Sequence, residues 1–346
     1  MNEEMYTVNP IIDLITVDDN TVYVKSPLSG FTIKGANIPT AINDIMQIFL
    51  KAGSIDCAVD ALFGKYSENT LLSMLTYLVD KKVLVCSTEV EAYLKHDKRF
   101  LEKSYVYTFG GNTLSETTEK FEALQIGIVG TELLARSIMD NFISGDLVSG
   151  FNIGMTDSSK TLSNFHADAS LTYFDMKYYQ NALRDIVERS DFIIAAFNSQ
   201  SQSLLMEINS HCLSLRKHWL RICVDGLSAE AGPLFLYDSG PCYSCMTIRS
   251  RKNMNPAELA YFDFKSKEKA QEATHFTSIK RGSLFPLNHI ASSVAHAEIM
   301  KYYSGMKCSL VSQAISIDGC TYETDFHHIF KSYECPVCNN PGSAVL

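Results

Sequence analysis

The sequence predicts an α/β protein in which a small winged-helix domain, residues 1–88, precedes a larger Rossmann-like domain, residues 121–346. The polar and charged residues 89–120 are predicted to link the two domains. Three observations lead to this prediction. Short strands and amphipathic helices fill the first 88 residues, apolar strands alternate with helical stretches after residue 120, and two C-x-x-C pairs lie in the last third of the chain.

The first domain is predicted from the order of its elements, which is three strands, three helices and a final strand. Turn-forming residues separate the strands, as at Asp18-Asp19-Asn20. Ser54 and Ser67 are placed to cap the second and third helices. This order is typical of a winged helix. The predicted strands are Ile11–Val17, Val22–Lys25, Phe31–Lys34 and Val83–Val85, and the predicted helices are Pro39–Lys51, Ser54–Gly64 and Ser67–Lys81.

The second domain is predicted to hold a parallel sheet with helices on its faces, because apolar strands alternate with helical stretches. The segment Phe262–Arg281 mixes acids and bases and is predicted to be a mobile loop over a nucleotide cleft. The predicted strands are Leu124–Val129, Gly150–Met155, Leu171–Phe174, Phe192–Phe197 and Trp219–Val224, and the predicted helices are Glu132–Phe142, Tyr178–Glu188, Ser201–Leu215 and Leu287–Tyr303.

Composition and charge exclude several classes of function. The chain has 46% hydrophobic and 20% charged residues, which is an ordinary globular balance, and no apolar run long enough to span a bilayer. We therefore expect a cytoplasmic protein without a membrane partner. Its net charge of −9 disfavours nucleic-acid binding. Residues 1–105 hold 10 Lys and Arg against 14 Asp and Glu, so the winged helix lacks the basic face of a DNA reader.

Four of the ten cysteines form the pairs Cys242/Cys245 and Cys335/Cys338. Two C-x-x-C turns supply the four thiolates of a tetrahedral Zn²⁺ shell, so we predict a structural zinc site that joins segments distant in sequence. A redox C-x-x-C and a catalytic zinc are alternatives. One pair suffices for redox chemistry, and four thiolates leave no open position for water on a catalytic zinc.

The turn after the first strand of the second domain has lost most of its phosphate-binding character. A nucleotide loop of this fold uses several glycines and a helix N-terminus to approach phosphate. Here only Gly130 stands at the turn, and Glu132 places a carboxylate where phosphate would approach. The sequence therefore predicts a plain strand-to-helix turn with weakened nucleotide binding.

The runs AGPLFLYDSGPCYSCMTIRSRKN and YECPVCNNP carry a resemblance to a known family. They resemble the ThiF/MoeB family of ubiquitin-activating-enzyme-like adenylating proteins, and more closely its ThiF-like partner proteins in thiazole/oxazole-modified microcin biosynthesis. The resemblance spans about residues 120–340. The N-terminal winged helix is similar to the peptide-recognition element of these systems.

The resemblance implies which nucleotide-site residues remain. Gly130 corresponds to the glycine-rich loop, Asp157 to the ribose-side acid and Ser163-Asn164 to the Ser-Asn that follows it. The usual arginine is missing, and Asn198 stands where the family has a magnesium-binding aspartate. An amide is a poorer Mg²⁺ ligand than a carboxylate, so ATP is not expected as a cofactor of this chain.

The resemblance also implies partners. We expect this chain to bind the leader of a ribosomal precursor peptide and to present its core to a separate, ATP-dependent YcaO-type cyclodehydratase. A flavin-dependent azoline dehydrogenase and a second copy of the chain are further implied partners. The leader is expected to add a strand to the edge Phe31–Lys34, facing helix Ser67–Asp80. The predicted peptide contacts are Phe31, Thr32, Ile33, Lys34, Thr76 and Tyr77.

Two other functions stay open at the level of sequence. An active adenylating enzyme would activate a peptide carboxylate with ATP, and it would need compensation for Glu132 and Asn198. A winged-helix regulator with a zinc-bound sensor domain would bind duplex DNA with a steep salt dependence, which the acidic first domain disfavours.

Overall fold

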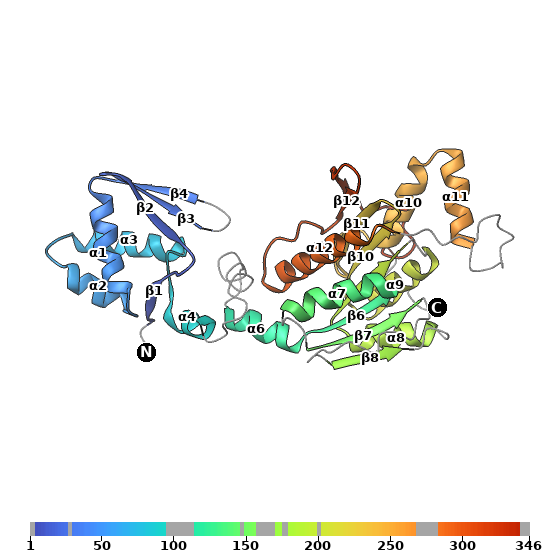
Figure 1. Ribbon diagram of the computed structural model, residues 1–346, viewed down its shortest axis with the longest axis horizontal. Coiled ribbons are helices and arrows are strands. Elements are labelled where there is room, and N and C mark those ends of the chain that lie inside the picture. Colours follow the sequence, from blue (N-terminus) through green and yellow to red (C-terminus); the bar gives the residue numbers. More distant parts are fainter. Residues whose placement is uncertain are drawn as a thin grey trace. The chain divides into compact units, whose positions relative to one another are not determined.

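The computed structural model describes residues 4–26, 30–94, 114–145, 149–156, 170–174, 179–198, 202–267 and 283–339 (Figure 1). The chain divides into two compact units, Met1–Thr117 and Thr118–Leu346. Each unit has a hydrophobic core of its own. Helix α6 (Leu114–Ala123) begins within the segment predicted as a linker, residues 89–120, and extends three residues beyond it.

The first unit combines two small antiparallel sheets with short helices. One sheet has the order β2-β3-β4, so β4 is an edge strand, and the other pairs β1 with β5. The sequence missed β1, which is short. The strands are β1 (Tyr6–Val8), β2 (Asp13–Asp18), β3 (Thr21–Lys25), β4 (Gly30–Lys34) and β5 (Leu84–Cys86), and the helices are α1 (Ile38–Phe49), α2 (Ile55–Leu62), α3 (Glu68–Asp80) and α4 (Ser87–Leu94).

Helix α3 shows how this sequence forms its local structure. The Ser67 hydroxyl accepts a hydrogen bond from the Thr70 backbone N–H at 3.2 Å, which caps the helix start. Leu71, Leu75 and Leu78 are buried at the i, i+4, i+7 spacing of one helix face. One residue turns the helix by about 100°, so the neighbouring Leu72 lies off this face and is exposed.

The second unit is built around an eight-stranded sheet of order β13-β12-β11-β10-β9-β6-β7-β8. The five strands from β10 to β8 are parallel, and β11, β12 and β13 continue the sheet antiparallel. The prediction of an α/β fold with a mostly parallel sheet is thus confirmed. The strands are β6 (Gln125–Gly130), β7 (Gly150–Met155), β8 (Ser170–Phe174), β9 (Phe192–Phe197), β10 (His218–Asp225), β11 (Ser228–Phe235), β12 (Gln313–Asp318) and β13 (Thr324–His328).

Helices cover both faces of this sheet (Figure 1). On one face α7 and α12 pack together, and the rings of Phe142 and Phe151 meet edge to face at 6.4 Å. On the other face α8, α9 and α10 cover a core that includes Trp219 stacked on Phe235. The helices are α7 (Glu132–Gly145), α8 (Tyr179–Arg189), α9 (Gln202–Ser214), α10 (Tyr243–Asn253), α11 (Pro256–Lys267) and α12 (Phe285–Tyr303).

Part of the segment Phe262–Arg281, predicted as a mobile loop, is helical. Residues 262 to 267 form the end of α11, and residues 268–281 lie outside the described residues. None of the helices in the described part of the chain is long and apolar enough to cross a membrane.

Candidate metal centre, nucleotide crevice and peptide groove

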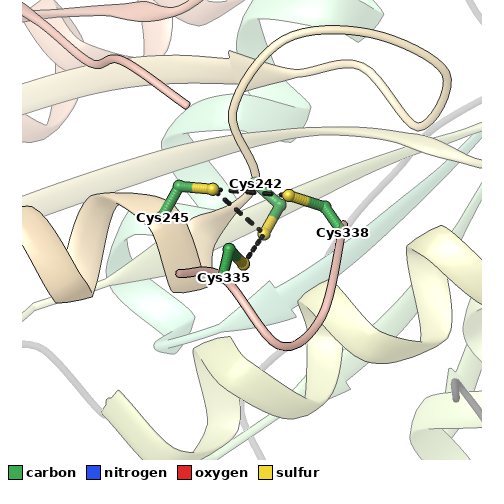
Figure 2. Close-up of side chains that lie close together, drawn as sticks. All are labelled: Cys242, Cys245, Cys335 and Cys338. Atoms are coloured by element: carbon green, nitrogen blue, oxygen red, sulfur yellow. Dashed lines mark hydrogen bonds between the residues drawn. The ribbon is translucent and has the colours of Figure 1, made fainter. Parts of the chain in front are cut away.

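The structure brings the four predicted metal-binding thiols together (Figure 2). Their Sγ atoms all lie within 4.8 Å of one another. Cys242 lies 4.0 Å from Cys245 and 3.6 Å from Cys335, and Cys245 lies 3.4 Å from Cys338. A tetrahedral zinc shell with Zn–S bonds near 2.3 Å separates its sulfurs by about 3.8 Å. The spacing of the four thiols therefore fits a single tetrahedral ion.

The surroundings of the thiols favour a closed, structural site. Cys242, Cys245 and Cys335 are buried, and Leu213 and Val337 pack against them. The hydrogen bond from the Cys242 thiol lowers the pKa of Cys245 to about 4, while that contact and burial raise the pKa of Cys242. A divalent cation bound by the four sulfurs would stabilise their thiolate forms.

Local structure positions each cysteine pair. Cys242 is the N-cap residue of α10, and Cys245 lies in the first turn of that helix. Cys335 and Cys338 follow β13 in a tight segment. The Asn339 side-chain amide closes that segment by donating to the carbonyls of Ser332 at 2.9 Å and Tyr333 at 2.8 Å. The local structure therefore places both cysteine pairs close together without the help of an ion.

Side chains on α10 also hold the C-terminal cysteine segment. Arg249 donates to the Lys331 carbonyl at 3.1 Å, and its guanidinium lies 5.4 Å from the centre of the Phe330 ring. Lys252 forms an ion pair with Glu334. The first pair lies at a helix start, which is also where redox C-x-x-C motifs occur. Helix position therefore does not separate the zinc and redox interpretations, whereas the convergence of four thiols favours a metal.

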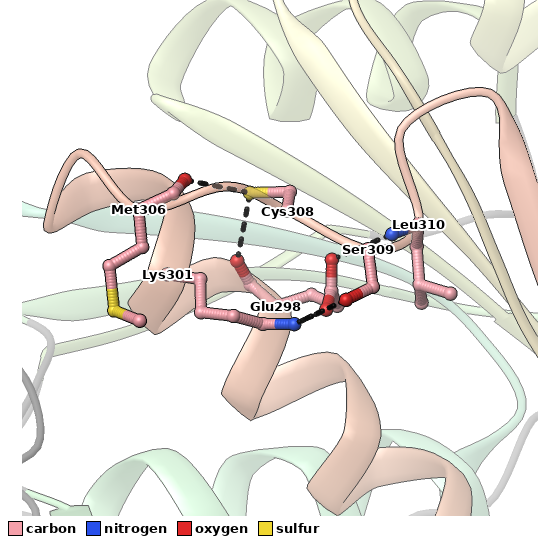
Figure 3. Close-up of polar contacts among 6 residues, drawn as sticks. All are labelled: Glu298, Lys301, Met306, Cys308, Ser309 and Leu310. Atoms are coloured by element: carbon pink, nitrogen blue, oxygen red, sulfur yellow. Dashed lines mark hydrogen bonds and ion pairs between the residues drawn. The ribbon is translucent and has the colours of Figure 1, made fainter. Parts of the chain in front are cut away.

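A second polar cluster anchors the chain that leads toward these cysteines (Figure 3). Glu298, buried in α12, forms an ion pair with Lys301 and accepts a hydrogen bond from the Leu310 backbone N–H at 2.9 Å. Lys301 also donates to the Ser309 hydroxyl at 3.1 Å. The Cys308 thiol donates to the Glu298 carbonyl at 3.6 Å. The buried pair thus fixes residues 308–310, directly before β12.

The carboxyl ends of β6 and β9 form the point at which the strand order reverses, where ligands of this fold bind. Gly130 ends β6 here, as the sequence predicted. A Cβ on Gly130 would lie 1.6 Å from the carbonyl oxygen of Ala196, so the two strands leave no room for a side chain. Gly130 is therefore required by strand packing, whether or not phosphate binds.

Asn198 forms several hydrogen bonds at this edge of the sheet. Its Oδ1 accepts from the Thr131 hydroxyl at 2.7 Å, which ties the end of β9 to the turn after β6. Its amide nitrogen donates toward the Asn288 side-chain oxygen at 3.0 Å, and it also lies near the Val224 carbonyl and the Ser283 hydroxyl. The Asn198 side chain is thus engaged by hydrogen bonds within the protein.

The structure describes only some of the other residues predicted at the nucleotide site. Glu132 begins α7 as predicted, but its carboxylate pairs with Arg136 one turn along the helix at 3.3 Å. This pairing weakens the like-charge argument against phosphate, because part of the negative charge is neutralised. Asp157 and Ser163-Asn164 lie outside the described residues.

A groove of about 650 Å³ runs between edge strand β4 and helix α3. Apolar side chains form much of its wall, and polar residues of α3 form its rim. It is lined by Thr32, Ile33, Lys34, Ile38, Ile42, Asn69, Thr70, Ser73, Met74, Tyr77 and Leu78.

Most of the predicted peptide contacts lie at this groove. Thr32, Ile33, Lys34 and Tyr77 line it, and the Phe31 ring meets the Tyr77 ring edge to face at 6.4 Å. Thr76 is exposed and is not among the lining residues. The sequence missed the other seven lining residues. On α3 the missed residues include Asn69 and Ser73, which lie on the same face as Tyr77 at i, i+4 spacing.

Comparison with known proteins finds solved structures that resemble this chain. No protein-family model matches the chain, and no curated protein matches its sequence. The microcin C7 biosynthetic enzyme MccB in complex with N-formylated MccA superimposes with a TM-score of 0.71 at 12% identity, over 96% of this chain and 99% of that one. E. coli MccB solved with ATP gives a TM-score of 0.70 at 11% identity, over 96% and 99% of the two chains.

The heterocyclase TruD matches with a TM-score of 0.60 at 16% identity, over 97% of this chain and 43% of TruD. The chain therefore spans less than half of TruD but nearly all of MccB. At such identities the likeness establishes the fold, which is that of MccB and of part of TruD.

Proposed function

We propose that this chain is a peptide-binding component of a machinery that modifies ribosomal peptides. It holds the leader of a precursor peptide in the β4–α3 groove and presents the core to a separate, ATP-dependent YcaO-type cyclodehydratase. The observation that supports this best is the groove beside β4, an edge strand whose backbone has a strand partner on one side only. An extended peptide is able to pair with such an edge while its side chains enter the groove.

The proposal assigns no ATP chemistry to this chain. The Thr131–Asn198 hydrogen bond spans the crevice at the reversal of strand order, and no carboxylate stands at position 198 to hold Mg²⁺. The tetrathiolate site holds a structural zinc ion in this proposal, since its donor set leaves no position for substrate.

The full-length likeness to MccB favours a second candidate, an adenylating enzyme that activates a peptide carboxylate. MccB has been solved with ATP and with the peptide MccA, whereas TruD is a heterocyclase. The two candidates share the peptide groove and differ in the use of the crevice.

The first experiment tests the groove. Fluorescein-labelled leaders of candidate precursor peptides are synthesised, and their binding is measured by anisotropy. Ser73→Trp fills the groove from α3, whereas Thr76→Trp places the same ring on the same helix outside the lining. We expect Ser73→Trp to weaken binding at least tenfold and Thr76→Trp to leave it unchanged. Equal binding by both variants and wild type contradicts the proposal.

The second experiment separates the two candidates. ATP–pyrophosphate exchange is measured with the purified chain and the full precursor peptide, and then with the YcaO-type partner added. We expect no exchange by the chain alone. In the presence of the partner, we expect ATP-dependent loss of water from the peptide, seen by mass spectrometry. Exchange by the chain alone establishes the adenylating enzyme instead.

A further inference from the structure

One exposed lysine borders the groove. Of the lining residues only Lys34 is basic or acidic, and it forms no ion pair within the described residues. The rest of the lining is apolar or neutral. The chain as a whole carries a net charge of −9, so it repels strongly acidic ligands at long range. A lone ammonium at the border of such a groove suits one carboxylate on a ligand that otherwise carries little negative charge.

The alternation of exposed and partly buried side chains along β4 determines which peptide residue would carry that carboxylate. Along the strand Ile33 is partly buried and packs on the core, while Thr32 and Lys34 are exposed. A peptide pairing with β4 alternates its side chains in the same way, and residues directly opposite share a face. The residue opposite Ile33 therefore points toward the groove floor, and its neighbour opposite Lys34 points to the lysine.

We infer that the groove selects an extended peptide segment with an apolar residue directly adjacent to one aspartate or glutamate, whose side-chain carboxylate pairs with Lys34. The inference rests on the proposed peptide-binding function and adds the chemistry that the peptide must carry. The apolar side chain enters beside Ile33 and Met74, and the acid sets the register of the strand. A peptide that has the apolar residue but lacks the acid binds more weakly and shifts its register along β4 more readily.

Selection from a random library tests this without knowledge of the natural peptide. A messenger-RNA display library of random 12-residue peptides is selected on the immobilised full chain, and peptides retained by Ser73→Trp are discarded. The same selection is run on Lys34→Glu and on Lys25→Glu, a matched charge reversal on β3 outside the groove lining. We expect wild type and Lys25→Glu to enrich an Ile, Leu or Phe next to an acid, and Lys34→Glu to enrich the apolar residue next to Lys or Arg.

Binding of one selected peptide then gives the size of the effect. Replacing its acid with glutamine weakens binding to wild type about fivefold, the upper range for a partly exposed ion pair. Replacing it with lysine restores binding to Lys34→Glu. Selected peptides without an acid, or an acid preference that Lys34→Glu leaves unchanged, overturn the inference while the groove stands. A library with no peptide sensitive to Ser73→Trp overturns the proposed function itself.

Discussion

At the scale of single residues, Asn198 links the carboxyl ends of β6 and β9 by hydrogen bonds. Its amide accepts from one side and donates to the other, so it joins Thr131 to Asn288 across the carboxyl edge of the sheet. A carboxylate could accept from Thr131, but it has no hydrogen to donate to the Asn288 side-chain oxygen. The neutral side chain is therefore matched to its neighbours in this sheet.

Thr131→Val tests that contact. Valine keeps the shape of the threonine side chain but loses the hydroxyl, so Asn198 Oδ1 and the Asn198 N–H lose a partner. We expect a loss of about 1–2 kcal/mol in the free energy of unfolding, measured with urea. The exposed Thr172→Val on β8 is the control and should change stability by less than about 0.5 kcal/mol. Equal stabilities of the two variants would show that the Thr131 contact does not form.

His296 is a second residue with a local consequence. It is buried against the Phe142 ring at 4.6 Å, and its Nε2 has no hydrogen-bond partner among the described residues. Burial lowers its pKa to about 4. The folded state therefore favours the neutral ring, while the unfolded chain takes up a proton near pH 6.5.

This difference predicts a pH dependence of stability. The contribution of His296 is present above pH 6.5 and is lost as the pH falls toward 4, by about 2 kcal/mol at pH 5. Urea unfolding at pH 7 and pH 5 should show a smaller difference for His296→Phe than for wild type. The exposed His289→Gln on the same helix should behave like wild type. An identical difference in all three proteins would contradict the lowered pKa.

At the scale of elements, the C-terminal segment depends on contacts with α10. Four thiols, the Arg249 hydrogen bond and the Lys252–Glu334 pair connect it to that helix, while all five residues of β13 are exposed. The exposed side chains contribute little burial, so we infer that the metal site supplies much of the order of residues 330–339.

Metal analysis tests this inference. We expect about one zinc ion per chain by elemental mass spectrometry, and a large loss of zinc and of thermal stability in Cys338→Ser. Cys320→Ser removes an exposed cysteine outside the cluster and should retain both. A protein that contains no zinc and has an unchanged melting temperature in Cys338→Ser would rule out a structural ion.

The same elements show which parts of the fold and of the sites could be predicted from the sequence alone. Strands such as β9 are apolar throughout and alternate with amphipathic helices, so local pattern predicted them. In contrast, β13 reads TDFHH and has no alternation of buried and exposed residues, because pairing with β12 alone makes it a strand. The cysteines were predictable from spacing. Asn69 and Ser73 were not, because polar residues on a helix look the same whether they face water or a groove.

At the scale of the whole molecule, the two units have separate cores, and the metal site belongs to the second one. Chelation with EDTA should therefore increase hydrogen exchange in α10 and residues 330–339, and leave α3 and β4 unchanged. Hydrogen-exchange mass spectrometry with and without chelator measures this. Faster exchange in β4 after chelation would show that the peptide groove depends on the metal.

Gly130 shows how the ancestry of such a protein could be misread from its sequence. The carbonyl of Ala196 leaves no space for even a methyl group there, so mutation to any larger residue would disrupt the meeting of two central strands. Natural selection would retain this glycine long after a chain stopped handling nucleotides. A sequence search that counts this glycine as the remainder of a phosphate-binding motif would therefore be misled, because strand packing alone requires it.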